Sequence, residues 1–582
     1  MKFFHVYNDD CFKGLEKNGL INKHTGFKIQ HAYSVPEERL FNCYAAEGSK
    51  LFDLIKEGNY PFYVDRVAGG VPYFTYRFNR ELIRKYRELL GDWFLGFQMH
   101  ESASNRRFSE WQHIMQRMGG KGPYDPVKLE FAMRSTKAKL VDGTPLWDLS
   151  HDHPEYFATL SYAETYEDFL REVAEMFRRR MVDTDDNVLP CDSFYLLPKL
   201  QDEMGMRTFM PEVGSQIPLM RIAVALARGV AHSSGKTWGA YYECWRHTIG
   251  EFDFNMPCFN ADPINEWYLP QEQFPFDFST TGENGGSSRL LQNRIYYHAL
   301  MSGADYFSEE WGLNCSYTNM QTFELSSYGQ VKKDFIRAAE DIQGIQAVTP
   351  FAIVLPKKYI CVELPELFDA KVYYAYQCGN HREVYMRSPL NEADKLCFGH
   401  IEDVIKLFFA RQDELYGNEG HVLTNSHFGD LFDIIYEDAD DEILSRYAYL
   451  IDATREGSFA KAKANGTYKI LESGDLDSLK AQVHALEKTC MPCVVDGLHW
   501  LVSVDEKGQK YLTIFNNEGN TRSIENGDVL DHRADRRVKV TFRNRAQLRI
   551  VQSSGSDVAV EWLDPFNSYV TVPAAGFAVM AF

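Results

Sequence analysis

The chain lacks long hydrophobic runs, an excess of positive charge and a cysteine framework, and each absence excludes a class of protein. No run of about 18 or more uninterrupted apolar residues occurs, so we expect no membrane partner. The formal net charge is −20 and Lys and Arg do not cluster, which argues against a nucleic-acid partner, because phosphate binding needs grouped cations. Eleven cysteines, an odd number scattered over 582 residues, fit free thiols better than disulfides.

Several short motifs are missing as well. The segment Met1-Lys-Phe-Phe-His-Val-Tyr-Asn-Asp has no apolar core of a signal peptide, so we expect a cytoplasmic protein. Neither a P-loop phosphate cradle nor a Gly-x-Ser-x-Gly elbow occurs. One Cys-x-x-Cys pair, Cys490 and Cys493, has no second pair to complete four zinc ligands. The sequence therefore predicts no metal and no cofactor.

Length and aromatic content indicate a large, ring-rich protein. A chain of 582 residues exceeds what one hydrophobic core normally supports, so we expect several domains. Aromatic residues make up 14% of the chain, which is on the high side. Most single rings fill a core, but aromatic walls also suit the weakly hydrated faces of sugars.

Short β-like runs alternate with helical patterns from the N-terminus to about residue 346, as in repeated βα units around a parallel sheet. Eight such runs precede residue 357, with helical apolar spacing between them. We therefore expect a (β/α)₈ TIM barrel over residues 1–356. The expected strands are Phe3–Tyr7, Phe27–Ala32, Phe62–Val67, Trp93–Met99, Thr208–Pro211, Thr237–Tyr242, Asp305–Ser308 and Phe351–Leu355.

The pattern changes after the barrel. Strand-like and helix-like stretches, the latter near Phe428–Tyr436, alternate over 357–495 and predict a smaller flavodoxin-like α/β domain. From residue 496 to 582, short runs of alternating apolar and polar residues are separated by Gly and Asn turns. This pattern predicts a C-terminal antiparallel β-sandwich.

Four expected barrel strands are each followed by, or end in, a glutamate: Glu101, Glu212, Glu243 and Glu310. The carboxyl ends of barrel strands meet at one rim, where active sites lie. Glycosidic bond cleavage needs two carboxyl groups, and in retaining enzymes these stand about 5–5.5 Å apart. The sequence therefore predicts a two-carboxylate site, with Glu310 as nucleophile and Glu101 as general acid/base.

These residues resemble the clan A glycoside hydrolases, which are retaining (β/α)₈ enzymes. On the strand count above, Glu101 ends strand four and Glu310 ends strand seven, the two strands that carry acid/base and nucleophile in that clan. Glu310-Trp311-Gly312 is similar to the segment around many nucleophiles of the clan, whereas His100-Glu101 replaces its usual Asn-Glu. The domain order resembles family 42 β-galactosidases, whose middle domain is similar to a glutamine amidotransferase. The resemblance implies a β-galactosidase-like glycosidase acting on O-glycosyl bonds.

Further residues are expected to contact the sugar, and some have open alternatives. Glu309 either faces the opposite side of its strand or replaces Glu310, and Tyr242 either bonds the nucleophile or faces the helices. Glu212 and Glu243 compete with Glu101 for the acid/base role. The expected substrate-binding residues are His100, Glu212, Glu243, Tyr242, Trp311, Glu309, Arg66, Trp245 and Trp267.

Two long connections, 102–162 and 246–288, are expected to wall off one end of the cleft and favour exo action on a terminal sugar of a short glycan. They could equally form the contacts of a homo-oligomer, which we expect. One alternative is a metal-dependent or lyase-type carbohydrate enzyme on the same barrel, because His100 and the neighbouring acids could bind a divalent ion. Another is a non-catalytic glycan-binding or assembly protein.

Overall fold

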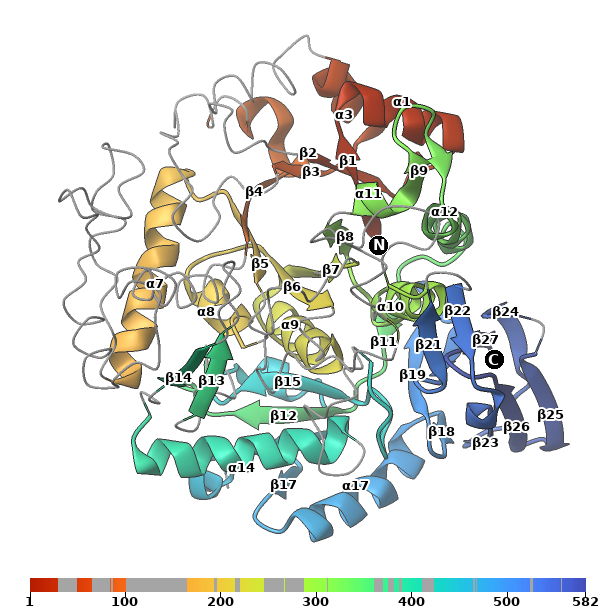
Figure 1. The fold of residues 1–582 in the computed structure, drawn as a ribbon. Coiled ribbons are helices and arrows are strands. Elements are labelled where there is room, and N and C mark those ends of the chain that lie inside the picture. The colour runs from red at the N-terminus through yellow and green to blue at the C-terminus, as the bar shows by residue number, and fades with distance from the viewer. Residues whose placement is uncertain are drawn as a thin grey trace.

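A computed structural model gives the fold of the chain (Figure 1). The residues that it describes are 1–29, 50–64, 84, 87–100, 165–192, 196–214, 220–244, 266, 287–310, 312–360, 370–374, 382–386, 390–410, 423–463, 466, 468–523, 527–555 and 557–582. No helix within these ranges has the length and apolar character needed to cross a bilayer.

Eight parallel strands close into a barrel, which confirms the expected fold class. The strands are β1 (Lys2–Tyr7), β2 (Thr25–Ile29), β3 (Phe62–Val64), β4 (Phe94–His100), β5 (Val188–Asp192), β6 (Thr208–Gly214), β7 (Thr237–Glu243) and β8 (Tyr306–Glu310). Seven of them match expected strands, whereas β5 was not expected. The run Phe351–Leu355, expected as the eighth barrel strand, is β12 of a second sheet.

Helices surround this barrel in the βα order that the sequence predicts. They are α1 (Asp9–Asn18), α3 (Lys50–Gly58), α7 (Tyr166–Asp183), α8 (Pro198–Glu203), α9 (Met220–Ser234), α10 (Arg289–Met301), α11 (Gly312–Ser316) and α12 (Ser327–Ala339). Side-chain oxygens of Ser288 and Ser326 accept backbone N–H groups at the starts of α10 and α12, as N-caps do. Both helices therefore begin at defined positions beside β8.

Alternation along each strand sends one set of side chains inward and the next outward. The inward set includes a cluster of Phe4, Tyr63, Leu189, Cys191, Met210 and Tyr241. The Tyr63 hydroxyl also hydrogen-bonds the Ser308 hydroxyl at 2.7 Å, from β3 to β8. The outward set, which includes Phe3 and Phe307, packs against the helices. The interior of the barrel is thus filled with side chains below its rim.

The second domain holds a four-stranded parallel sheet in the order β15-β12-β16-β17, the α/β arrangement expected for the middle of the chain. Its elements are β12, β15 (Phe432–Tyr436), β16 (Tyr449–Asp452), β17 (Ile470–Glu472), α14 (Glu392–Phe409), α15 (Asp441–Leu444), α16 (Ser458–Ala462) and α17 (Leu476–Cys490). The stretch near Phe428–Tyr436, expected to be helical, contains strand β15 instead. A separate hairpin pairs β13 (Ala370–Tyr374) with β14 (Arg382–Met386).

Two antiparallel sheets form the C-terminal domain and confirm the expected β-sandwich. One has the order β11-β19-β20-β27-β24 and the other β18-β23-β26-β25. The strands are β11 (Gln346–Ala347), β18 (Cys493–Val495), β19 (His499–Val504), β20 (Lys510–Phe515), β23 (Arg536–Phe542), β24 (Arg549–Ser553), β25 (Ala559–Asp564), β26 (Asn567–Val572) and β27 (Phe577–Ala581). Short pairs β9 (Tyr317–Asn319) with β10 (Glu324–Leu325), and β21 (Asn520–Ser523) with β22 (Gly527–Leu530), complete the strands.

Helix α9 joins the barrel to the second domain, and Figure 1 shows it between the two sheets. It packs against β6 and β7 on one side and against β15 on the other. A Cβ on Gly229 would lie 2.2 Å from the carbonyl oxygen of Ile434, so only glycine permits this close approach. Buried Arg228 donates to Asp433 of β15 at 2.6 Å. The barrel and the second domain are therefore fused through a buried, charged interface.

Candidate active site

Three glutamates lie at or near the carboxyl ends of consecutive barrel strands. Glu212 lies on β6, Glu243 on β7 and Glu310 on β8, and they are only 1%, 2% and 3% exposed. Each is two residues beyond an inward-facing residue of its strand, namely Met210, Tyr241 and Ser308. Alternation therefore places all three carboxyl groups on the interior face.

Two of these glutamates, Glu243 and Glu310, lie directly opposite each other. The two residues are in register on adjacent parallel strands, where neighbouring backbones stand about 4.8 Å apart. Glu243 is also in register with Gly214 of β6, and a Cβ on this glycine would lie 2.3 Å from the Cβ of Glu243. The glycine thus leaves room for the Glu243 side chain at the rim.

A buried lysine lies inside the barrel near these acids. Lys28 of β2 is 3% exposed and is in register with Val6 and Tyr63. Its ammonium group donates to the backbone carbonyl of Glu309 at 3.0 Å and to the Tyr241 hydroxyl at 3.3 Å. Sequence reasoning missed this residue, and the only signal was a single lysine in the run Thr25-Gly-Phe-Lys-Ile29.

Glu309 faces the helices and not the interior, so the alternative in which it replaces Glu310 is wrong. Its carboxylate lies 2.5 Å from the Lys332 ammonium and accepts a hydrogen bond from Tyr328 at 2.6 Å and another from Tyr296. Burial, followed by the charge of Glu309, holds the pKa of Tyr296 well above its usual range, so this phenol remains a donor. Glu309 is therefore bound within the protein rather than offered to a sugar.

Tyr242 also faces the helices, which contradicts its expected role as a sugar contact. Its hydroxyl hydrogen-bonds that of Ser287, and its ring packs against Tyr296 and Phe307. The one-residue step from inward-facing Glu243 explains this orientation. The alternative that the sequence left open, a tyrosine between strand and helix, is the one that the structure confirms.

Cysteines support the ends of β7 and β8 from outside the rim. The Cys244 thiol donates to the backbone carbonyl of Glu310 at 2.9 Å and lies 3.7 Å from the Cys315 sulfur. Both thiols are buried, and burial holds the pKa of Cys244 well above its usual range. Seven cysteines of the described residues are free, as the sequence predicts.

Several expected site residues lie outside the described residues. These are Glu101, Arg66, Trp245, Trp267 and Trp311, together with the side chain of His100, whose backbone ends β4. Their expected roles stay predictions.

The strand count changes the comparison with clan A. Because β5 was missed, Glu310 ends the eighth strand and not the seventh, and Glu243 ends the seventh. The expected position of Glu101, after the fourth strand, is unchanged because β4 ends at His100. The premise that placed Glu310 on strand seven is therefore wrong.

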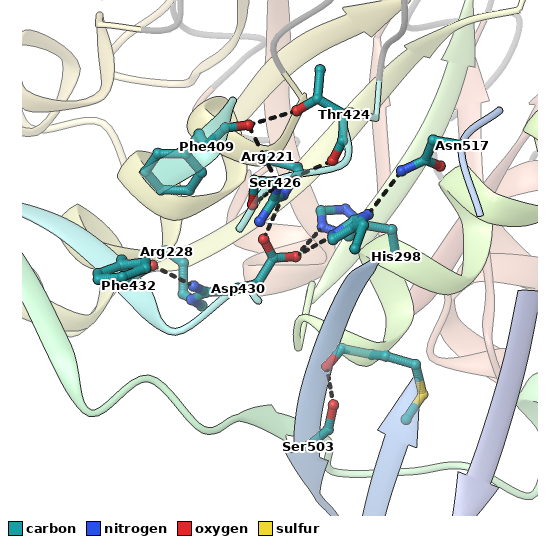
Figure 2. A network of polar contacts seen from close by, with 12 residues as sticks. Arg221, Arg228, His298, Phe409, Thr424, Ser426, Asp430, Phe432, Ser503 and Asn517 are labelled. Atoms are coloured by element: carbon teal, nitrogen blue, oxygen red, sulfur yellow. Dashed lines mark hydrogen bonds and ion pairs between the residues drawn. The ribbon is translucent and has the colours of Figure 1, made fainter. Parts of the chain in front are cut away.

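One group of side chains among the described residues has the donor set of a metal site. The ligand atoms of His298, Asp430 and His499 lie within 4.8 Å of one another, and all three side chains are buried. Figure 2 shows His298 and Asp430 side by side in this group. Both imidazole Nε2 atoms contact the same Asp430 oxygen, at 2.8 and 2.7 Å, and Arg221 donates to the other oxygen at 2.7 Å. An ion here would have to displace both imidazole protons beside a guanidinium, so the geometry favours a hydrogen-bonded junction.

This junction predicts the direction of the acid sensitivity of the fold. Burial lowers the pKa of His298, and it lowers that of His499 to about 3. In the unfolded chain each imidazole takes up a proton near pH 6.5, whereas in the folded protein it does so only at lower pH. The contribution of the two neutral histidines to the free energy of unfolding is therefore present above about pH 6.5 and is lost as pH falls toward 3. We expect the midpoint of urea unfolding to fall from pH 7 to pH 4, and to fall less in His499→Gln. An equal fall in wild type and variant would contradict this assignment.

Comparisons with known proteins give structural likeness only. No family model and no curated protein sequence matches the chain. Among solved structures, α-L-fucosidase isoenzyme 2 from Paenibacillus thiaminolyticus is 9% identical with a TM-score of 0.42, over 95% of this chain and 99% of that one. A β-galactosidase from Halorubrum lacusprofundi is 10% identical with a TM-score of 0.34, over 100% and 99%. A family 30 xylanase from Clostridium acetobutylicum is 8% identical with a TM-score of 0.33, over 100% and 95%. Identities this low say nothing about activity.

Proposed function

We propose that the protein is a retaining glycoside hydrolase that removes a terminal sugar from a short glycan. The observation that carries this proposal is the register of Glu243 and Glu310 on adjacent strands at the carboxyl end of a closed barrel. Side chains on backbones about 4.8 Å apart can place their carboxyl groups at the separation of about 5–5.5 Å that double displacement requires.

The two carboxyl groups take different roles in this proposal. Glu310 attacks the anomeric carbon as the nucleophile, because the Lys28 cation contacts the carbonyl of the preceding residue and favours a charged carboxylate there. Glu243 gives its proton to the leaving oxygen and later takes one from the attacking water. Mutual repulsion of two close carboxylates and their burial both favour one protonated partner.

A second assignment of roles keeps the same reaction. The corrected count places Glu243 at the end of β7, and the resemblance to clan A puts the nucleophile on the seventh strand and the acid/base after the fourth. In that assignment Glu243 is the nucleophile, Glu101 is the acid/base and Glu310 binds the sugar. Either assignment forms a covalent ester with one glutamate of the rim.

Trapping the ester tests both the reaction and the roles. We expect the wild type to release the phenol from at least one aryl glycoside of a panel, and the matching 2-fluoro sugar to inactivate it. Peptide mass mapping should then find one added sugar on Glu310, whereas a label on Glu243 would support the second assignment. Release of phenol without any label would contradict the retaining mechanism.

The panel also separates the rival functions. A metal-dependent or lyase-type enzyme on this barrel would lose activity in chelator, whereas the proposed hydrolase keeps it. A glycan-binding or assembly protein would release no phenol and would bind sugar equally well as Glu310→Ala. Random internal cleavage of a polymer would refute exo action. The cytoplasmic location and the homo-oligomeric state stay predictions.

A further inference from the structure

Lys28 is a buried lysine in the barrel interior, where its charge needs a negative charge nearby. Among the described strands of the barrel it is the one buried lysine or arginine, and its stem lies among apolar and aromatic side chains. A buried ammonium group is costly without an opposite charge, and it otherwise loses its proton. Its ammonium group contacts the Glu309 carbonyl and the Tyr241 hydroxyl, which are both uncharged.

The charged groups that share the interior with Lys28 in the described part of the barrel are acids. Glu212, Glu243 and Glu310 face inward from β6, β7 and β8, and each is almost fully buried. Among the described strands, the other titratable groups near this end of the interior face are the thiol of Cys191 and the phenols of Tyr63 and Tyr241, since Tyr306 lies at the opposite end of β8. Asp192, at the end of β5, lies one residue beyond inward-facing Cys191. Within the described strands, Lys28 is therefore the one cation of an interior that holds three glutamates.

The position of the ammonium group favours Glu310 among these acids. The carbonyl that Lys28 contacts at 3.0 Å belongs to the peptide bond between Glu309 and Glu310. The second contact, the Tyr241 hydroxyl, belongs to the residue two before Glu243 on the same face of β7. Lys28 thus lies just below the two carboxyl groups of the proposed site.

We propose that Lys28 is a positioning residue whose charge keeps the Glu310 carboxylate ionised, and so sets the acid limit of activity. This inference rests on the proposed function. An opposite charge within about 4–6 Å lowers a carboxyl pKa by about 1–3 units, so the nucleophile stays charged at acid pH. Lys28 acts through Glu310 and takes no proton from the sugar.

The variant Lys28→Gln tests this role, because glutamine keeps a donor for the Glu309 carbonyl and removes the charge. We expect the acid limb of kcat/KM against pH, measured on an aryl glycoside, to move toward neutral pH by about one unit or more. Lys332→Met is the matched control, since Lys332 is a buried lysine that contacts Glu309 from the opposite face of β8. Its acid limb should stay at the wild-type position. An unmoved limb in Lys28→Gln, or an equal shift in both variants, would overturn the proposal.

Stability gives a readout that does not depend on activity. Without the cation, the interior carboxyl groups bind protons more readily in the folded protein than in the unfolded chain, where the pKa of Glu is about 4.3. The stability lost in Lys28→Gln should therefore be smallest near pH 4–5 and should grow toward pH 8. A deficit that is the same at every pH would overturn the charge pairing. If the wild type cleaves no aryl glycoside but the deficit grows with pH, the proposed function fails and the pairing stands.

A variant that keeps the charge covers the case in which Lys28→Gln does not fold. Lys28→Arg should leave the acid limb of the profile at the wild-type position, even if overpacking lowers its melting temperature. A limb shifted toward neutral pH in this charged variant would overturn the proposal.

Discussion

Replacing Glu310 by alanine is expected to lower kcat on an aryl glycoside by about 10⁴-fold or more, because no other group then forms the glycosyl ester. A small anion should restore part of this loss, since the shortened side chain leaves a space for azide beside the anomeric carbon. The product of the rescued reaction should be a glycosyl azide of inverted configuration, which can be identified by NMR. The kinetic loss and the rescue together identify the nucleophile.

The comparison variant for this experiment is Glu243→Ala. As acid/base, Glu243 should lose about 10²–10⁴-fold in activity, and less on a substrate whose phenol needs no proton to leave. Azide should then yield a product of retained configuration. An azide product of inverted configuration from Glu243→Ala, and not from Glu310→Ala, would assign Glu243 as the nucleophile. Wild-type rates in both variants would contradict a two-carboxylate mechanism at this rim.

Periodicity predicted the barrel, and its errors have physical causes. Strand β5 was missed because Pro190 stands in its centre, and proline argues against a central strand. The run Phe351–Leu355 was placed in the barrel because a fully buried parallel strand has the same apolar sequence in any parallel sheet. Its pairing with β15 and β16 assigns this strand to the second sheet, and such pairing joins residues far apart in the sequence, so the local pattern does not show it.

The site was predictable where it depends on position along a strand. Alternation indicates that Glu309 and Glu310 face opposite sides, and the structure shows Glu309 on the helix side. Which glutamates are neighbours was not predictable, because one missed strand changes the order of all later ones. The role of Lys28 was not predictable either, because a single lysine in a short strand is normally expected to face solvent. Only the closed barrel shows that this lysine is buried.

Replacing Asp430 by asparagine is expected to lower the free energy of unfolding by about 3–5 kcal/mol, the usual effect of breaking a buried ion pair. Asp430 lies two residues before β15 in the middle domain. It contacts Arg221 of α9 and His298 of α10 (Figure 2), and also His499 of β19. Burial alone would raise the pKa of Asp430, but Arg221 and the two histidines hold it well below its usual range. One carboxylate therefore ties the barrel, the middle domain and the C-terminal domain together.

The stability lost in Asp430→Asn arises mainly from the buried Arg221 charge that remains without its partner. Arg221 would keep its hydrogen bonds to the Thr424 carbonyl and the Ser426 hydroxyl, but its charge would stay buried without a partner. Asp441→Asn is the matched control in the same domain, because its ion pair with Lys463 at 2.6 Å lies at the surface and should contribute at most about 1 kcal/mol. Urea unfolding followed by tryptophan fluorescence measures both variants. Equal losses in the two would show that the junction is not what holds the three domains together.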